Sequence, residues 1–169
     1  YGDHRDLHSF PTRRSSDLVL NRATILATDI DQVVLDKARL GVYLRNEVKS
    51  LPPQLLAKYF RQEGEAFHFC DDLKKRVEFK NHNLLRDPYP EEMDLIICRN
   101  VVIYFTEEAK NQLYLGFNRS LRDGGYFLAG GTEPILYYRQ FGFENVGLSF
   151  YQKIGPPQLD ANDSPRSLL

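Results

Sequence analysis

Residues 93–105 of this 169-residue chain read MDLIICRNVVIYF, and this stretch decides the fold prediction. Residues 93–98 are almost entirely apolar and are bounded by polar residues, which is typical of a strand covered on both faces. We therefore expect a central strand of a parallel sheet. The polar pair Arg99 and Asn100 then separates two apolar runs at the carboxyl end of that strand, where ligands bind in open α/β sheets.

The sequence downstream of this stretch predicts a helix followed by two strands. Thr106 has the position of a helix N-cap, and Glu107 and Glu108 follow in the first turn. Apolar residues then recur at helical spacing, namely Ala109, Leu113, Phe117 and Leu121. Residues 123–125, Asp-Gly-Gly, should end this helix. Residues 126–129 and 148–154 are expected to be strands.

The upstream sequence alternates between short apolar runs and amphipathic stretches, which predicts the α/β class. Residues 23–28 form a β-type run that ends in the acidic turn 29–31. The helical face expected next consists of Val33, Val34, Ala38 and Leu40. Prolines 52–53 are expected to open another helix. Residues 66–70 and 76–79 alternate in polarity, and we expect them to pair as a small antiparallel ribbon.

Composition excludes several classes of function. The 22 basic and 23 acidic side chains nearly cancel, so no broad electropositive surface for nucleic acid is expected. No apolar run approaches the ~20 residues of a membrane span, which predicts a cytoplasmic protein without membrane insertion. Cys70 and Cys98 lack C-x-x-C spacing. We interpret them as buried thiols and expect no metal site.

The two ends of the chain are expected to lie outside the folded domain. Residues 1–18, YGDHRDLHSFPTRRSSDL, lack helical and strand periodicity. At all eighteen positions this string resembles the conceptual translation of a sequencing adapter oligonucleotide, so we interpret it as a non-native, disordered segment. Residues 155–169 carry Pro, Asp and Ser with little apolar content and predict a disordered tail.

Asp29 is the first candidate binding residue, because it stands where a strand of a doubly wound sheet would end. An acidic side chain at such a position accepts hydrogen bonds from ribose hydroxyls. The alternative is a helix N-cap, a role that Asp31 could fill equally well.

Two further candidate sites also follow strand-like segments. The amide of Asn83 could pair with an adenine edge while Leu84 packs on the ring face, although an ordinary turn residue is the alternative. Arg99 and Asn100, if buried, need hydrogen-bonding partners. A ligand or a purely structural network could supply them.

The order of these motifs resembles the chemotaxis receptor methyltransferase (CheR) family from residue 23 to about residue 154. The matching strings include ILATDID, VLDKAR, VEF, NLL and, most specifically, CRNVxIYF; GGTEPI, FGFE and SFYQK resemble Gram-positive-type members. The resemblance implies the Rossmann-like fold of S-adenosylmethionine-dependent methyltransferases in a partial domain of residues 19–154. A linker helix and a small β-subdomain would occupy about residues 43–80.

Members of this family transfer a methyl group from S-adenosylmethionine to glutamate side chains of chemoreceptors and release S-adenosylhomocysteine. The resemblance implies cofactor contacts by Asp29 at the ribose, Asn83 and Leu84 at the adenine, and Arg99 and Asn100 near the reactive end. It also implies that Tyr104 lines the methyl-transfer site, where a core aromatic is the alternative. The implied partner is the cytoplasmic domain of methyl-accepting chemoreceptors, and we expect a monomer.

The sequence departs from the family pattern in two places. The N-terminal helical domain, the first strand and its glycine-containing acidic loop are not found, and no G-x-G-type loop stands between Val19 and Asp29. We therefore expect a truncated sheet that exposes apolar surface, and an inactive fragment that binds cofactor weakly. The β-subdomain region is also compact, which suggests a parent enzyme that does not depend on the receptor's C-terminal pentapeptide.

Three other functions compete with this interpretation. A methyltransferase-like signalling domain could act on a substrate other than a chemoreceptor. A non-catalytic receptor-binding module could use the ribbon at residues 66–79, although such a module has no need of a complete set of cofactor residues. A nicotinamide-dependent dehydrogenase is disfavoured by the CRNVxIYF string.

Overall fold

The computed structural model describes residues 22–131 and 133–158. The chain divides between His82 and Asn83 into two compact units, and each is described by itself. Segment 1–18 and most of the predicted tail lie outside the described residues. Among the helices of the described ranges, none is long and apolar enough to cross a membrane.

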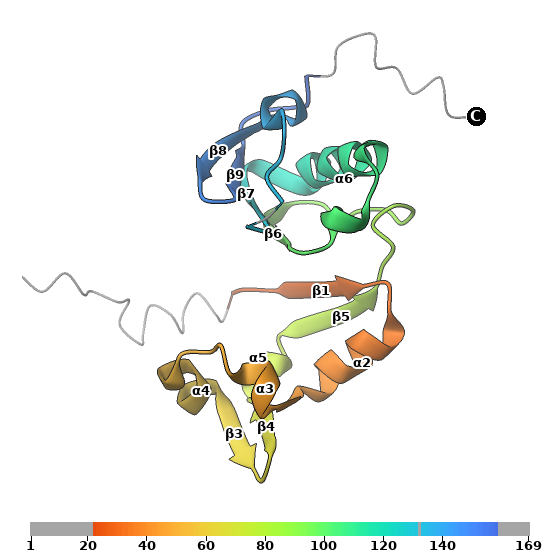
Figure 1. Cartoon of the computed structure of the whole chain (residues 1–169). Helices are drawn as coiled ribbons and strands as arrows, with labels where there is room; N and C mark the ends of the chain where they lie inside the picture. The colour runs from red at the N-terminus through yellow and green to blue at the C-terminus, as the bar shows by residue number, and fades with distance from the viewer. Residues whose placement is uncertain (1–21, 132, 159–169) are drawn as a thin grey trace, which may run out of the picture. The chain divides into compact units, whose positions relative to one another are not determined.

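The first unit contains two small sheets and four short helices among its described residues (Figure 1). Its elements are β1 (Ile25–Asp29), α2 (Gln32–Leu40), β2 (Val42–Leu44), α3 (Arg45–Val48), α4 (Pro53–Tyr59), β3 (Phe60–Glu63), β4 (Ala66–Phe69), α5 (Asp71–Lys74) and β5 (Val77–Asn81). Strands β1 and β5 are parallel, with Ile25 opposite Val77 and Asp29 opposite Asn81. The other sheet is antiparallel, in the order β2-β4-β3.

Local sequence explains the β1–α2 turn. The carboxylate of Asp31 accepts a hydrogen bond from the backbone N–H of Val33 at 2.8 Å and so caps α2. Gly41 ends the helix in the left-handed conformation, with φ of 64°. The predicted strand, acidic turn and helix are therefore confirmed. The predicted apolar face is not buried, since Val33 is 76% and Leu40 67% exposed.

The predicted antiparallel ribbon is wrong. Residues 66–69 do form strand β4, but it pairs with β2 and β3. Strand β5 instead pairs in parallel with β1. Alternation of polarity identified both strands, yet it contains no information on the partner of each strand.

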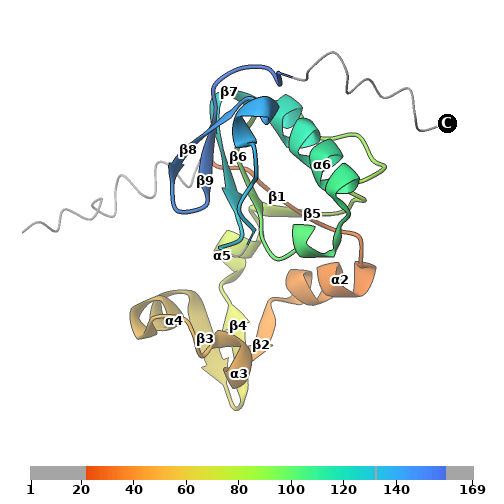
Figure 2. The ribbon, with the colours of Figure 1, turned by 45° about the horizontal axis from the view of Figure 1, so that its top comes forward.

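The second unit is a four-stranded sheet in the order β6-β7-β9-β8, packed against a long helix (Figure 2). Its elements are β6 (Met93–Cys98), the 3-10 turn η1 (Val102–Tyr104), α6 (Glu107–Ser120), β7 (Leu121–Ala129), the 3-10 turn η2 (Tyr138–Phe141), β8 (Phe143–Gly147) and β9 (Phe150–Lys153). Strands β6 and β7 are parallel, whereas β9 is antiparallel to β7 and β8. The mixed α/β class is confirmed.

The core of this unit lies between α6 and the sheet. Phe127 of β7 is 1% exposed and its ring centroid lies 5.0 Å from that of Phe117 on α6. Leu113 and Phe143 are fully buried in the same cluster. The hydroxyl of Thr106 accepts a hydrogen bond from the N–H of Ala109 at 3.3 Å, which confirms the predicted N-cap of α6.

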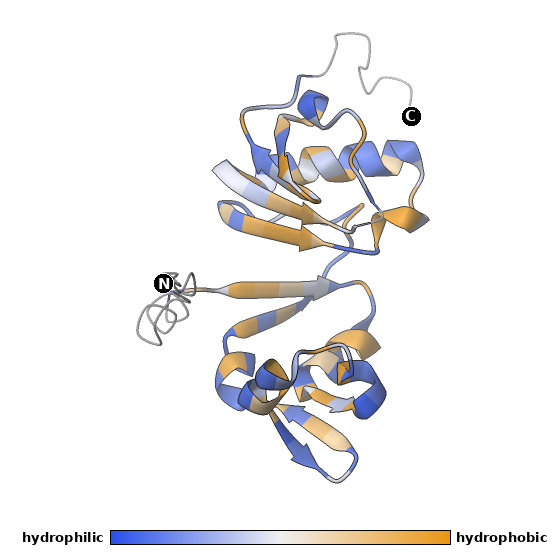
Figure 3. Ribbon diagram, turned by 60° about the vertical axis from the view of Figure 1, so that its left-hand side comes forward, coloured by the Kyte–Doolittle hydropathy of each residue, from blue (hydrophilic) through white to orange (hydrophobic). Residues whose placement is uncertain are grey.

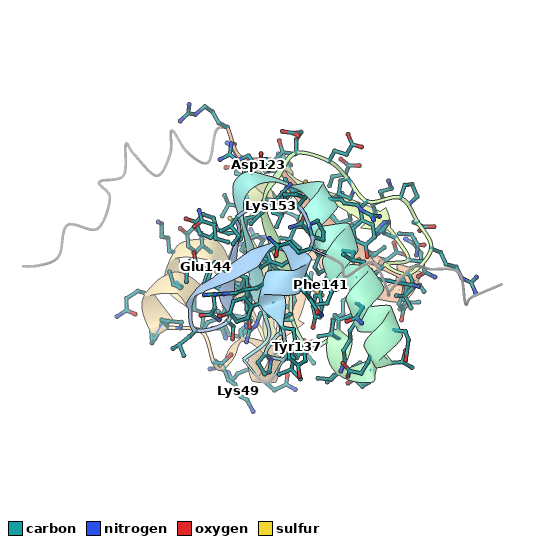
Figure 4. All side chains as sticks on the ribbon, turned by 90° about the horizontal axis from the view of Figure 1, so that it is seen from above. Lys49, Asp123, Tyr137, Phe141, Glu144 and Lys153 are labelled. Carbon is teal, nitrogen blue, oxygen red and sulfur yellow. The ribbon has the colours of Figure 1, made fainter. Side chains whose placement is uncertain are left out.

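Two details of the second unit differ from prediction. Strand β6 is the terminal strand of its sheet and not a central one, because β7 is its hydrogen-bonded neighbour and β1 and β5 form a separate sheet. Helix α6 ends at Ser120, so the Asp-Gly-Gly sequence lies inside β7. Lys153 holds the start of β7 there, donating to the carbonyl of Leu121 at 2.7 Å and pairing with Asp123 at 3.3 Å (Figure 4).

The boundary of the predicted C-terminal tail also needs correction. The amide of Asn118 donates to the carbonyl oxygen of Gly155 at 3.0 Å, and the N–H of Gln158 donates to that of Gln140 at 2.8 Å. The buried Asn118 and the turn η2 therefore hold residues 155–158 against the second unit. Residues 159–169 lie outside the described range.

Candidate functional site

The segment that follows β6 leaves the strand through an unusual backbone conformation. Asn100 has a φ of 59°, in the left-handed region that asparagine tolerates better than most residues. The chain then turns through η1, where Val102 is buried and Tyr104 is 80% exposed. The predicted residues Arg99, Asn100 and Tyr104 are therefore carried on one short segment, and all three are exposed.

A buried carboxylate holds this segment. Glu133 is 5% exposed. Its Oε2 accepts a hydrogen bond from the N–H of Asn100 at 2.7 Å, and its Oε1 accepts one from the N–H of Ile103 at 3.2 Å. The side chains of Arg99 and Asn100 are exposed, so the partners expected for a buried pair are not required, and the contact is made instead by the backbone of Asn100 with an acid 33 residues away.

Sequence reasoning missed Glu133. The residue belongs to the GGTEPI string that supported the family resemblance, but a lone acid in a loop has no local feature that marks it as buried. The feature that marks its burial is Gly130, three residues earlier in the chain, where an added Cβ would lie 2.0 Å from Glu133 Oε2. A glycine with a carboxylate pressed against it can be identified only in three dimensions.

Burial and this carboxylate change the acidity of neighbouring groups. Burial, with a smaller contribution from the charge of Glu133, raises the pKa of Cys98 to about 11. Burial also raises the pKa of Tyr114 to about 12, with Glu133 again the second cause. Both groups therefore stay protonated at neutral pH.

Asn83 and Leu84 lie in the turn that opens the second unit. The Oδ1 of Asn83 accepts from the N–H of Leu85 at 2.9 Å, and the N–H of Asn83 donates to Asp87 Oδ2 at 2.7 Å. This is the ordinary turn role that the sequence left open. Among the hydrogen bonds that the structure describes, the side-chain NH₂ of Asn83 makes none, so this group can donate to a ligand.

Tyr89 fixes this turn to the core. Its hydroxyl donates to the carbonyl of Leu84 at 2.6 Å. Its ring lies against Gly116 of α6, where an added Cβ would approach the ring to 2.6 Å. Leu84 itself packs against the core cluster. Glycine on α6 is therefore required for the close approach of Tyr89.

Asp29 belongs to the first unit and ends β1. Its Oδ1 accepts from the N–H of Asp31 at 2.8 Å, and its carbonyl accepts from the N–H of His82 at 3.0 Å. The N-cap of α2 is Asp31 and not Asp29. Asp29 therefore shapes the turn between strand and helix, and its carboxylate remains half-exposed.

A hollow lies in the described part of each unit. In the second unit a cavity of about 450 Å³ adjoins η1 and is lined by residues that include Ile103, Glu133 and Tyr137. Tyr137 and Phe141, both labelled in Figure 4, are four residues apart in the sequence. The side chain of Tyr137 is 77% exposed, whereas that of Phe141 is 1% exposed. The lining of this cavity combines exposed apolar side chains such as Tyr137 with polar ones such as Glu107 and Lys110.

The hollow of the first unit, of about 380 Å³, lies in the small β-subdomain. Its lining includes Lys58, Arg61, His68 and Lys74. Arg61 pairs with Glu63 at 2.8 Å and Lys74 with Asp71 at 2.9 Å. Its charges are therefore largely compensated, as on an ordinary solvated surface.

Comparison with known proteins identifies the relationship of the chain. The family described as "CheR methyltransferase, SAM binding domain" matches residues 13–151. A chemotaxis protein methyltransferase of Listeria innocua is 39% identical over 129 residues, which cover 76% of this chain and 49% of that protein. One of Borreliella burgdorferi is 42% identical over 117 residues, covering 68% of this chain and 41% of that protein.

The chain thus spans about half the length of the curated relatives it matches. Among solved structures, a TehB-like SAM-dependent methyltransferase from Corynebacterium glutamicum has a TM-score of 0.46 and 14% identity, covering 80% of this chain and 69% of that one.

Proposed function

Because the chain belongs to the CheR methyltransferase family, as its SAM-binding domain, we propose that its parent protein methylates glutamate side chains of chemoreceptors. S-adenosylmethionine is the methyl donor and S-adenosylhomocysteine the product. The observation that carries this proposal is the family match over residues 13–151. The acceptor is the cytoplasmic domain of a methyl-accepting chemoreceptor, and the enzyme acts as a cytoplasmic monomer.

The proposed cofactor residues are those named from the sequence. In the second unit, Asn100 and Arg99 contact the reactive end of the cofactor, and Asn83 with Leu84 contacts the adenine. The NH₂ group of Asn83 supports this role, because its Oδ1 is already used in the turn and an adenine ring nitrogen accepts from an amide donor. In the first unit, Asp29 binds ribose hydroxyls through its half-exposed carboxylate.

Methyl transfer to a carboxylate makes modest demands on the protein. An ionised glutamate is already a nucleophile, and the sulfonium supplies an excellent leaving group, so no strong general base is required. Alignment of carboxylate, methyl and sulfur can lower the barrier by ~7–11 kcal/mol. The exposed hydroxyl of Tyr104 is a hydrogen-bond donor suited to orienting the incoming carboxylate.

We also propose that this 169-residue chain is an inactive fragment. The sequence supports this, because no G-x-G-type loop stands between Val19 and Asp29. The compact β-subdomain, with a three-stranded sheet of three to four residues per strand, supports an enzyme that does not depend on the receptor's C-terminal pentapeptide.

The experiment compares this chain with a version in which residues 1–18 are replaced by the matching N-terminal part of the Listeria innocua relative. Calorimetric titration with S-adenosylhomocysteine is expected to show binding only to the extended protein. The extended protein should also transfer tritiated methyl groups to a purified receptor cytoplasmic domain as base-labile esters. Micromolar affinity of the 169-residue chain would overturn its inactivity, and absence of transfer by the extended protein would overturn the function.

Tyr104→Phe tests the proposed catalytic residue in the extended protein. Loss of the hydroxyl should lower kcat roughly tenfold, about the value of one hydrogen bond, with little change in S-adenosylhomocysteine affinity. Tyr126→Phe, on β7 and 40% exposed, is the matched control and should leave kcat unchanged. Equal rates for Tyr104→Phe and the parent would assign the hydroxyl no part in transfer.

A further inference from the structure

We propose that Glu133 is a positioning residue for the proposed methyl transfer, because its carboxylate fixes the backbone that carries Asn100 and Tyr104. The inference rests on the proposed function for its significance. Its structural basis is independent, and lies in the contacts between two loops of the second unit.

The two loops follow neighbouring strands. Strands β6 and β7 are parallel, and Cys98 at the end of β6 lies opposite Ala129 at the end of β7. The chain after Cys98 forms the Asn100–Tyr104 segment, and the chain after Ala129 leads to Glu133. Parallel neighbours bring their carboxyl ends to the same edge of the sheet, so a side chain of one loop can reach the backbone of the other.

Both carboxylate oxygens are used in this contact. Oε2 accepts from the N–H of Asn100 at 2.7 Å and Oε1 from that of Ile103 at 3.2 Å. Hydrogen bonds to an ionised acceptor are stronger than neutral ones, and burial of the carboxylate strengthens them further. Two N–H groups converging on one anion also favour the left-handed conformation at Asn100.

Glu133 is itself held in place. Its N–H donates to the carbonyl of Gly130 at 3.0 Å, and the hydroxyl of Ser149 donates to the same carbonyl at 3.4 Å. Gly130 leaves the space that the carboxylate occupies, since an added Cβ there would lie 2.0 Å from Glu133 Oε2. The clamp therefore consists of an acid, a glycine that admits it and a hydroxyl that anchors the glycine.

The consequence concerns exposed side chains that core packing does not fix directly. Tyr104 is 80% and Ile103 53% exposed, so their own side chains make few core contacts, although the neighbouring Val102 and Phe105 pack in or against the core cluster. Bonds from the acid to residues 100 and 103 bracket the turn that ends at Tyr104. Without the clamp, Asn100 and the Tyr104 hydroxyl lose their fixed positions, even though neither side chain touches Glu133 in the described hydrogen bonds.

The test is amide NMR on the 169-residue chain, without cofactor or receptor. Glu133→Gln keeps one carboxamide oxygen as acceptor but places an NH₂ against the other backbone N–H. We expect the amide resonances of Asn100 and Ile103 to shift upfield and at least one to exchange with solvent roughly tenfold faster or more. Glu133→Ala should release both amides.

Gly130→Ala is the second variant, because it keeps the acid and displaces it. The same two amides should lose protection, while the core amides of β7 and β9 keep theirs. Glu144→Gln, an exposed carboxylate on β8 (Figure 4), is the matched control and should leave both resonances unchanged.

Unchanged shifts and exchange at Asn100 and Ile103 in folded Glu133→Gln and Gly130→Ala would overturn the proposal. So would a uniform loss of protection across β7 and β9, since that would make Glu133 a general stability residue. Neither outcome depends on methyl transfer, so failure of the clamp is distinguishable from failure of the proposed function.

Discussion

The two units of the chain bury their apolar residues to very different degrees. In the second unit, α6 and the four-stranded sheet enclose one continuous cluster that includes Phe127, Leu113 and Phe143. In the first unit the buried apolar side chains among the described residues are Leu35, Val48 and Phe67. Figure 3 shows that the first unit also has apolar segments, so composition does not explain the contrast.

The size of the sheets explains the difference in buried apolar residues better than composition does. A two-stranded and a three-stranded sheet, each with strands of three to five residues, offer too little area for a helix to cover, and such small sheets are marginal in water. Val33 and Leu40 of α2 are exposed, as expected beside so small a sheet. The lesson is that amphipathic sequence forms a core only where a large enough partner surface exists.

The largest expected effect is the loss of an aromatic ring from each core. Phe127 has the rings of Tyr114, Phe117, Phe143 and Tyr151 around it. Phe127→Ala should lower the free energy of unfolding by about 3–5 kcal/mol, measured by urea denaturation with circular dichroism. Phe67→Ala in the first unit should cost less, since few buried apolar side chains are found among the described residues of that unit. Equal losses would contradict the contrast between the units.

The next prediction compares the reactivity of the two cysteines, one in each unit. Cys98 is 8% exposed, and burial raises its pKa to about 11, whereas Cys70 is half-buried. Relative to an ordinary thiol with a pKa of 9.0, this shift lowers the thiolate fraction of Cys98 at pH 8 roughly a hundredfold. Cys98 should therefore react with iodoacetamide more slowly than the half-buried Cys70, because burial both limits access and raises the pKa of Cys98, as followed by mass spectrometry.

The sign of the pH dependence provides the control for this measurement. A raised thiol pKa means that the reactive thiolate of Cys98 keeps increasing up to about pH 11, so its labelling rate should rise through that range. In urea the two cysteines should react alike. Similar rates in the native protein would show that the second unit opens as readily as the first.

Sequence predicted the elements of both units much better than their partners. The N-caps Asp31 and Thr106 were readable because a cap is a local pattern of a few residues. The pairing of β5 with β1 was not, because the hydrogen-bonded neighbour of a strand depends on residues about fifty positions away. Strand β8 was also missed, since a run such as FENVG, residues 143–147, has weak alternation.

In the candidate site, too, local features could be predicted from the sequence and contacts between distant residues could not. The exposed Asn100 was singled out because it interrupts an apolar run, whereas the family resemblance alone pointed to Tyr104. Glu133 was not singled out, because its role comes from the adjacency of two strand ends and from the space beside Gly130. A buried acid that binds backbone N–H groups of another loop can be inferred from the strand order, but not from the residues around it.

The smallest effect compares the N-caps of α2 and α6. Asp31→Ala and Thr106→Ala each remove a side-chain acceptor for a helix N–H, at 2.8 Å and 3.3 Å, and each should cost about 1 kcal/mol. The two substitutions should destabilise different parts of the chain. Thr106→Ala should lower the stability of the second unit as a whole, because α6 supplies much of its core, whereas Asp31→Ala should increase hydrogen exchange in α2 and β1 without changing the exchange of β7 and β9. Asp31→Asn, which keeps an acceptor, should restore most of the protection in α2. If Asp31→Ala accelerated exchange in β7 and β9 as much as in α2, the two units would unfold together, and the difference in their cores would have no thermodynamic counterpart.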